Sequence, residues 1–99
     1  MISRHWRGLA KPAQADAYVE HLRIETFPAL NTMPGFISAS ILRRSQALGV
    51  EFLVVTQWAS LEAIHGFAGE DAETAVVPRK VQDMMVEYDR SARHYEVVL

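Results

Sequence analysis

The chain has 99 residues and a mass of 11.2 kDa, which suits a single domain with one core, so residues 1–99 are treated as one domain. A hydrophobic content of 49% and a charged content of 22% exclude a disordered or low-complexity chain. The net charge is −2 without a basic run, and cysteine is absent, so nucleic acid is not an expected partner and disulfides and zinc–thiolate sites are excluded.

The N-terminus carries charge within its first four residues and lacks the apolar run of a secretory signal. No segment reaches the ~18 consecutive apolar residues that a membrane span needs. We therefore expect a cytoplasmic protein with no membrane partner.

The first two elements are a strand and a helix. Residues 2–9 alternate bulky and polar side chains, which predicts a strand with Ile2, Arg4 and Trp6 on one face. A helical pattern of apolar residues follows and predicts a helix over residues 12–27, with a proline at each end.

A hairpin and a short helix come next. Turn-forming residues precede residues 36–44, which are predicted to be the second strand. Residues 51–58 are rich in β-branched and aromatic side chains and predict the third strand, paired with the second. Ser60 is a natural N-cap for a helix over residues 60–68.

The last part of the chain predicts one more helix and a closing strand. Apolar residues recur at i, i+3, i+4 and i+7 from Pro78 onward, at Val81, Met84, Met85 and Tyr88. Residues 90–98 then alternate again, which predicts the closing strand. The element order is βαββαβ, so we expect an α+β, ferredoxin-like fold with a four-stranded antiparallel sheet.

The third strand is apolar on both faces. Phe52, Val54 and Trp58 are expected to point one way, and Leu53 and Val55 the other. Helices would cover only one face of the sheet, so the other face needs a partner. We predict a homodimer in which two sheets meet face to face.

The order of elements and the segment 52–64, FLVVTQWASLEAI, resemble the antibiotic biosynthesis monooxygenase superfamily of dimeric α+β-barrel proteins. The segments 67–69, FAG, and 94–97, HYEV, extend the resemblance across nearly the whole chain. The resemblance implies the dimeric barrel fold. It also implies, as one activity of the family, oxygenation of a small aromatic or quinol compound without a cofactor. The alternative is a non-catalytic ligand-binding or stress-associated dimeric barrel.

The haem-degrading branch of that superfamily is disfavoured by the residues at the matching positions. The branch has an Asn on the first strand, a Trp on the helix after the third strand and a haem-ligating His beyond it. Here Trp6, Phe67 and Val77 stand at about those positions, and His65 falls too early. We therefore expect no cofactor.

Two histidines are candidate catalytic residues. His94 lies in the closing strand, which borders the cavity of this fold, and could act as a base or bind an anion. A structural histidine satisfied by Glu96 or Asp83 is the alternative. His65 is expected to face inward on the stripe of helix 60–68, where it would line a pocket or the edge of the core.

Four aromatic residues are candidates for substrate binding. Trp6 and Trp58 could each supply a planar wall and an N–H donor. Core packing is the alternative for both, and it is the preferred explanation for Trp58. Tyr18 could direct its hydroxyl into the cavity or be a core residue. Phe67 is the fourth candidate, because it lies in a segment that carries the family resemblance.

Arg43 and Arg44 end the second strand on opposite faces, so at most one can face the cavity. We place Arg44 and Asp83 among the candidate substrate-binding residues, and Asp83 or Glu51 would be the acidic partner that an inward-facing arginine needs. Both arginines could instead be solvated. The four histidines are scattered over four elements without metal-ligand spacing, so no metal site is expected.

Overall fold

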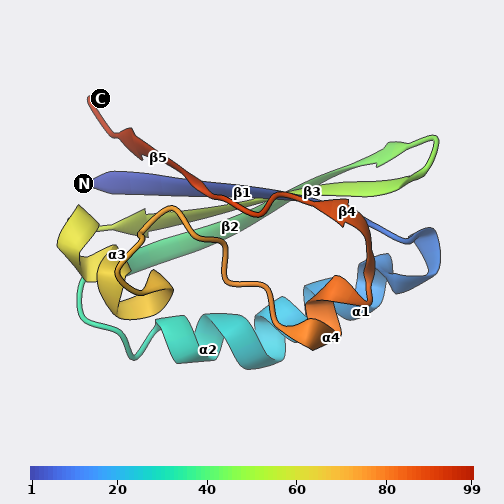
Figure 1. The fold of residues 1–99 in the computed structure, drawn as a ribbon, viewed down its shortest axis with the longest axis horizontal. Helices are drawn as coiled ribbons and strands as arrows, with labels where there is room; N and C mark the ends of the chain where they lie inside the picture. The colour runs from blue at the N-terminus through green and yellow to red at the C-terminus, as the bar shows by residue number, and fades with distance from the viewer.

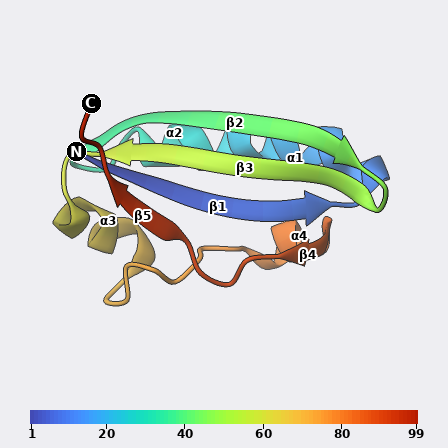
Figure 2. The same ribbon diagram turned by 90° about the horizontal axis from the view of Figure 1, so that it is seen from above.

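The computed structural model describes residues 1–99, which form one antiparallel sheet with helices on one face (Figures 1 and 2). The strands are β1 (Ile2–Ala10), β2 (Phe36–Gln46), β3 (Gly49–Trp58), β4 (Met85–Tyr88) and β5 (Arg93–Glu96). The order is β2-β3-β1, and both β4 and β5 pair with β1. Two short strands thus share the fourth position of the sheet, and the predicted α+β, ferredoxin-like fold is confirmed.

The first helical segment is longer than predicted because it continues through a proline. Its parts are a 3₁₀ turn (Pro12–Gln14), α1 (Ala15–His21), a π-helical segment (Leu22–Thr26) and α2 (Phe27–Leu30). The N–H of Phe27 donates to the Leu22 carbonyl, five residues earlier. Pro28 then lies in the first turn of α2, where its missing N–H costs little. A π turn at this point is the kind of irregularity that often accompanies functional residues.

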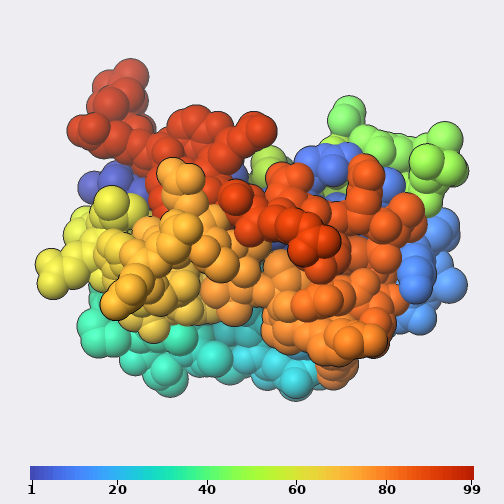
Figure 3. Space-filling model, in the orientation of Figure 1, coloured from blue at the N-terminus to red at the C-terminus, as the bar shows by residue number.

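The short helix α3 (Leu61–Ala68) begins and ends as predicted. The Ser60 hydroxyl accepts a hydrogen bond from the backbone N–H of Ala63 at 3.1 Å. Gly69 ends the helix with φ of +89°, a conformation that favours glycine. The chain then runs to the short helix α4 (Arg79–Gln82), and Figure 3 shows that the stretch from α3 to α4 covers one side of the molecule.

The predicted helix over residues 78–88 is wrong beyond Gln82. The chain turns there, and Met85–Tyr88 forms β4 against the end of β1. The N–H of Lys11 also donates to the Met84 carbonyl at 2.9 Å. Pairing with the unfilled edge of β1 satisfies backbone groups that a helix would leave exposed there, and this overrides the helical spacing of the side chains. The closing strand is correspondingly shorter than predicted.

The core consists of two clusters at opposite ends of the space between sheet and helices. Phe52 lies in one cluster, with Tyr18 in edge-to-face contact at 5.0 Å between ring centroids. Trp58 and Ile64 lie in the other, and both are fully buried. No helix is long and apolar enough to cross a membrane.

The other side of the sheet carries no helix (Figure 1). The strand register places Leu42, Leu53, Val55 and Tyr95 on this side, and these four residues are called the open face below. Leu42 is 53% exposed and Tyr95 is 49% exposed. β3 is therefore apolar on both faces, as predicted, and the dimer inferred from that pattern stays a prediction.

Candidate functional site

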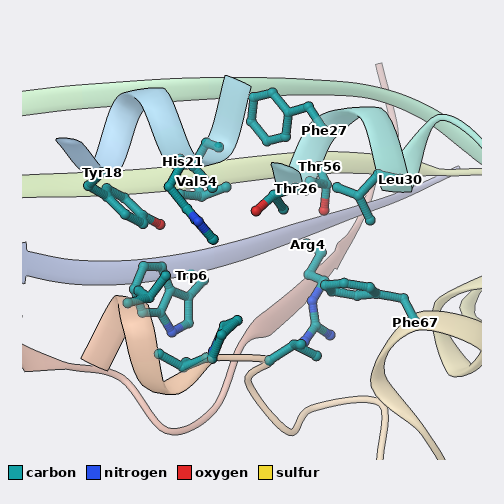
Figure 4. Close-up of a pocket in the computed structure, with 15 residues that line it drawn as sticks. Arg4, Trp6, Tyr18, His21, Thr26, Phe27, Leu30, Val54, Thr56 and Phe67 are labelled. Carbon is teal, nitrogen blue, oxygen red and sulfur yellow. The ribbon is translucent and has the colours of Figure 1, made fainter. Parts of the chain in front are cut away.

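A cavity of about 70 Å³ lies between the sheet and the helices (Figure 4). Its walls come from β1 and β3, from the helical segment that contains the π turn, and from the chain between α3 and α4. It is lined by members of both core clusters, such as Tyr18 and Leu30. The cavity therefore lies between the two core clusters.

The cavity continues into a wider groove of about 360 Å³. The cavity and the groove share six lining residues, namely His21, Thr26, Leu30, Phe67, Val76 and Pro78. The groove adds Glu25 and Lys80 at its outer edge. Together they have the size range of small-molecule sites, which begin at ~300 Å³.

Arg4 is the charged group of the cavity, and it comes from β1. The residue is 4% exposed. Its guanidinium donates to the carbonyls of Ala72 and Thr74, the latter at 2.8 Å, and lies 2.7 Å from Nε2 of His94. All three partners are neutral acceptors, and burial lowers the pKa of Arg4. Buried arginines are rare without an acidic partner. An anionic ligand in this cavity would give the Arg4 guanidinium the partner that the chain itself does not supply.

Aromatic side chains form the walls around Arg4. The Phe67 ring lies 5.6 Å from the Arg4 guanidinium carbon, within range of a cation–π interaction. Trp6 donates its indole N–H to the Asp89 carbonyl at 2.7 Å, which fixes the ring as a wall. Figure 4 shows the Tyr18 hydroxyl directed toward the same space, and burial raises the pKa of Tyr18, so the group remains a hydrogen-bond donor.

His21 is the histidine that lines this cavity, and it is 8% exposed. Its Nδ1 lies 2.9 Å from Oε2 of Glu25, one helical turn later. The same oxygen accepts a hydrogen bond from Lys80 at 2.7 Å. Lys80 and His21 hold the pKa of Glu25 below its usual range, so the side chain is a carboxylate. The helical segment and α4 are thus linked through one acidic group beside the cavity.

The two histidines expected to be catalytic lie elsewhere. Nε2 of His94 is occupied by Arg4, whereas the expected structural partners were Glu96 and Asp83. Arginine only donates, so Nε2 is the unprotonated nitrogen, and burial together with the Arg4 charge lowers the pKa of His94. His65 is exposed, and its Nδ1 lies 2.8 Å from the Gly69 carbonyl. The expectation that His65 faces inward is wrong.

Three of the candidate substrate-binding residues do not line the cavity. Trp58 is fully buried in the core, and its N–H donates to the Thr56 hydroxyl at 2.8 Å. Arg44 lies on the side of the sheet away from the helices and pairs with Glu51. Asp83 is exposed and lies 3.3 Å from Arg79. Trp6, Tyr18 and Phe67 are the candidates that the structure brings together at one cavity.

Sequence reasoning missed Arg4 and His21. The available signal for Arg4 was a charged residue between Ile2 and Trp6 on one face of the first strand, the face that the structure turns toward the helices. For His21 it was the spacing of four residues to Glu25 on a helix whose buried side includes Tyr18. No cluster of three or more histidine or acidic side chains is placed to hold a metal ion.

Comparison with known proteins identifies the family. The family model for antibiotic biosynthesis monooxygenase matches residues 1–79. The chain belongs to this family. No curated protein matches the sequence.

Solved structures of several family-like proteins share the fold. A Bacillus cereus protein, provisionally assigned as an antibiotic biosynthesis monooxygenase, is 21% identical with a TM-score of 0.66, over 99% of this chain and 91% of its own. A similarly assigned protein of Deinococcus radiodurans is 17% identical with a TM-score of 0.62, over 98% and 92%. The haem degrader MhuD of Mycobacterium tuberculosis, solved with two haems in its active site, is 23% identical with a TM-score of 0.63, over 100% and 97%. At these identities the likeness shows the fold alone.

The residues expected at the positions of the haem-degrading branch do not reproduce the ligation of that branch. Val77 lies in the cavity wall, and its alkyl side chain cannot ligate iron. Trp6 and Phe67 fill the other two positions, and both rings occupy the same cavity wall.

Proposed function

We propose that this family member binds a small, planar aromatic compound carrying an acidic hydroxyl and oxygenates it without a cofactor. The observation that carries the proposal is the buried guanidinium of Arg4, which faces an aromatic cavity and has no acidic partner. An aromatic ligand would lie against Trp6 and Phe67, and its negative oxygen would lie at Arg4.

The chemistry follows from the stabilised anion. A deprotonated hydroxyarene or anthrone is electron-rich enough to reduce dioxygen directly, so the protein needs to supply a proton acceptor, an anion site and a cavity closed to water. For an anthrone, the CH₂ group becomes C=O with one oxygen atom of dioxygen, and the other atom leaves as water. Dioxygen is therefore both the oxidant and the source of the new carbonyl oxygen.

Dioxygen uptake with anthrone, quinol and naphthol substrates tests the proposal, and quenching of tryptophan fluorescence reports binding independently. Ligand binding is expected to quench Trp6 in the wild type, and Trp6→Phe should lose this quenching because the remaining Trp58 lies in the core. Uptake that depends on substrate supports the proposal. If no compound binds and no dioxygen is consumed, the proposal is wrong.

A non-catalytic ligand carrier is the second candidate function. It is favoured by the small inner cavity and by the engagement of His94 with Arg4, which removes the expected base. Quenching without dioxygen uptake would support the carrier.

We also propose that the chain forms a homodimer through the open face. The support is its row of apolar side chains, each contributing roughly 25 cal/mol per Å² on burial. Sedimentation should give twice the 11.2 kDa of one chain. Val55→Asp would place a carboxylate in that interface and is expected to abolish the dimer or the fold. A folded wild-type monomer at micromolar concentration would refute the dimer.

A further inference from the structure

We propose that His21, oriented by Glu25, accepts the hydroxyl proton of the bound ligand, so that the ligand class of this cavity is a hydroxyarene held as its phenolate. The inference rests on the proposed function, because it needs an aromatic ligand in the cavity. The inference assigns the group that ionises the ligand. It also separates ligands that can give up a proton, such as phenols, from ligands that are already anions, such as benzoate.

The hydrogen bonds of His21 define which ring nitrogen is free. Nδ1 lies 2.9 Å from a carboxylate oxygen of Glu25, which can only accept. The neutral ring therefore carries its proton on Nδ1, and Nε2 holds the lone pair. Nε2 lies on the opposite side of the ring from the Glu25 contact, and Figure 4 shows the ring projecting from the helix into the cavity. A carboxylate that orients a histidine in this way also stabilises the imidazolium formed when Nε2 takes a proton.

The other three histidines are not placed for this role. His94 has its Nε2 against Arg4, and His65 is exposed. Nε2 of His5 lies 2.8 Å from the Ser3 hydroxyl, on the side of the sheet away from the helices. His21 combines a carboxylate partner, burial and a place in the cavity wall.

Charged and titratable groups from several elements face this site. Glu25 lies on the same helical segment and Lys80 on α4, and the two are paired with each other. Arg4 faces the cavity from β1, and Tyr18 faces it from α1. The O–H bond of the ligand breaks, an N–H bond forms at Nε2, and the electron pair stays on the ligand oxygen. The resulting phenolate lies in a cavity that holds the Arg4 cation and the Tyr18 donor, which favours the ionised pair.

The probe for this step is 4-nitrophenol, whose phenolate is yellow and whose phenol is colourless. The absorbance of the bound probe is followed between about pH 5 and 8, the range in which histidine changes charge. Wild-type protein is expected to lower the apparent pKa of the bound probe by about one unit, a tenfold gain in ionisation. Benzoate, which is already an anion in this range, measures binding without proton transfer.

Two variants separate the base from the anion site. His21→Gln should lose about tenfold in ionisation of bound 4-nitrophenol. Its affinity for benzoate should change less than threefold, about 0.6 kcal/mol. Glu25→Gln should give part of the same loss, and NMR of the imidazole nitrogens should show that the Nδ1–H form of His21 is no longer dominant. The matched control is His65→Gln, which removes an exposed histidine outside the cavity. Circular dichroism of each variant confirms folding.

The outcomes distinguish the inference from the function on which it rests. If His21→Gln binds benzoate and ionises 4-nitrophenol as well as the wild type, the inference is wrong and the proposed function survives. A wild-type imidazole protonated on Nε2 would also overturn the inference. If neither probe binds to the wild type, the proposed function fails and the inference fails with it.

Discussion

Replacing Arg4 with methionine removes the positive charge of the cavity while keeping a long, unbranched side chain. Arg4 is 4% exposed, and its guanidinium makes hydrogen bonds only to neutral acceptors. A hydrogen bond to a charged group contributes about 1.5–3 kcal/mol. Loss of one such bond to a ligand anion should weaken binding roughly ten- to hundredfold, since every ~1.4 kcal/mol is tenfold.

Arg4→Met should lower the free energy of unfolding by much less than the number of lost hydrogen bonds implies. The carbonyls of Ala72 and Thr74 lose their donor, which costs about 1–3 kcal/mol for each carbonyl that stays buried. Removal of an unpaired buried charge offsets this, because the guanidinium no longer has to be desolvated on folding. Arg4→Met is therefore expected to fold, with unfolding in urea as the measurement.

Isothermal titration calorimetry with benzoate and with a neutral aromatic of similar shape, benzamide, measures the charge effect. Arg4→Met should lose affinity for benzoate and keep most of its affinity for benzamide. The matched control is Arg43→Met, which removes the same charge from an exposed residue paired with Asp16. The reasoning is refuted if Arg4→Met binds benzoate like the wild type, or if Arg43→Met loses as much affinity.

Three further changes test the structure. Trp58→Ala should lower the free energy of unfolding by about 3–5 kcal/mol in urea titrations, because the side chain is fully buried. Burial and the Arg4 charge lower the pKa of His94 in the folded state, so the unfolded chain takes up this proton at a higher pH than the folded chain does. The free energy of unfolding is therefore expected to decrease as the pH drops below about 6.5. Thermal unfolding of His94→Gln should depend less on pH there. Gly8→Ala would place a methyl group 2.5 Å from the Trp6 ring, so ligand quenching of Trp6 should weaken.

Much of the fold is predictable from periodicity because its long strands are covered by helices on one face only. The alternation in β1 and β3 places side chains on the two sides of the sheet, as the observed register has them. Periodicity fails at β4, where helical spacing persists although the chain is extended. The deciding interaction there is backbone pairing with β1, which involves residues far apart in the chain and leaves no mark on local spacing.

The site is less predictable because its chemistry depends on which ring nitrogen each histidine has free. His94 and His21 are both single histidines on amphipathic elements in the sequence. Only the folded chain brings Arg4, 90 residues away, to Nε2 of His94. Glu25 lies four residues after His21, so this pair can be recognised in the sequence. The burial of His21 in the cavity wall depends on tertiary packing and cannot be recognised there.

The position of Arg4 is the strongest argument that the cavity exists for a ligand and is not a packing defect. The two core clusters on either side of the cavity each contain a large aromatic residue that is 0% exposed, Phe52 in one and Trp58 in the other. A methionine or leucine at position 4 would spare the desolvation of a cation. Residues that break the rules of packing without a structural gain tend to lie at functional sites. Arg4 is such a residue, because its charge is buried without an acidic partner. An anion bound against the guanidinium would offset the cost of burying that charge.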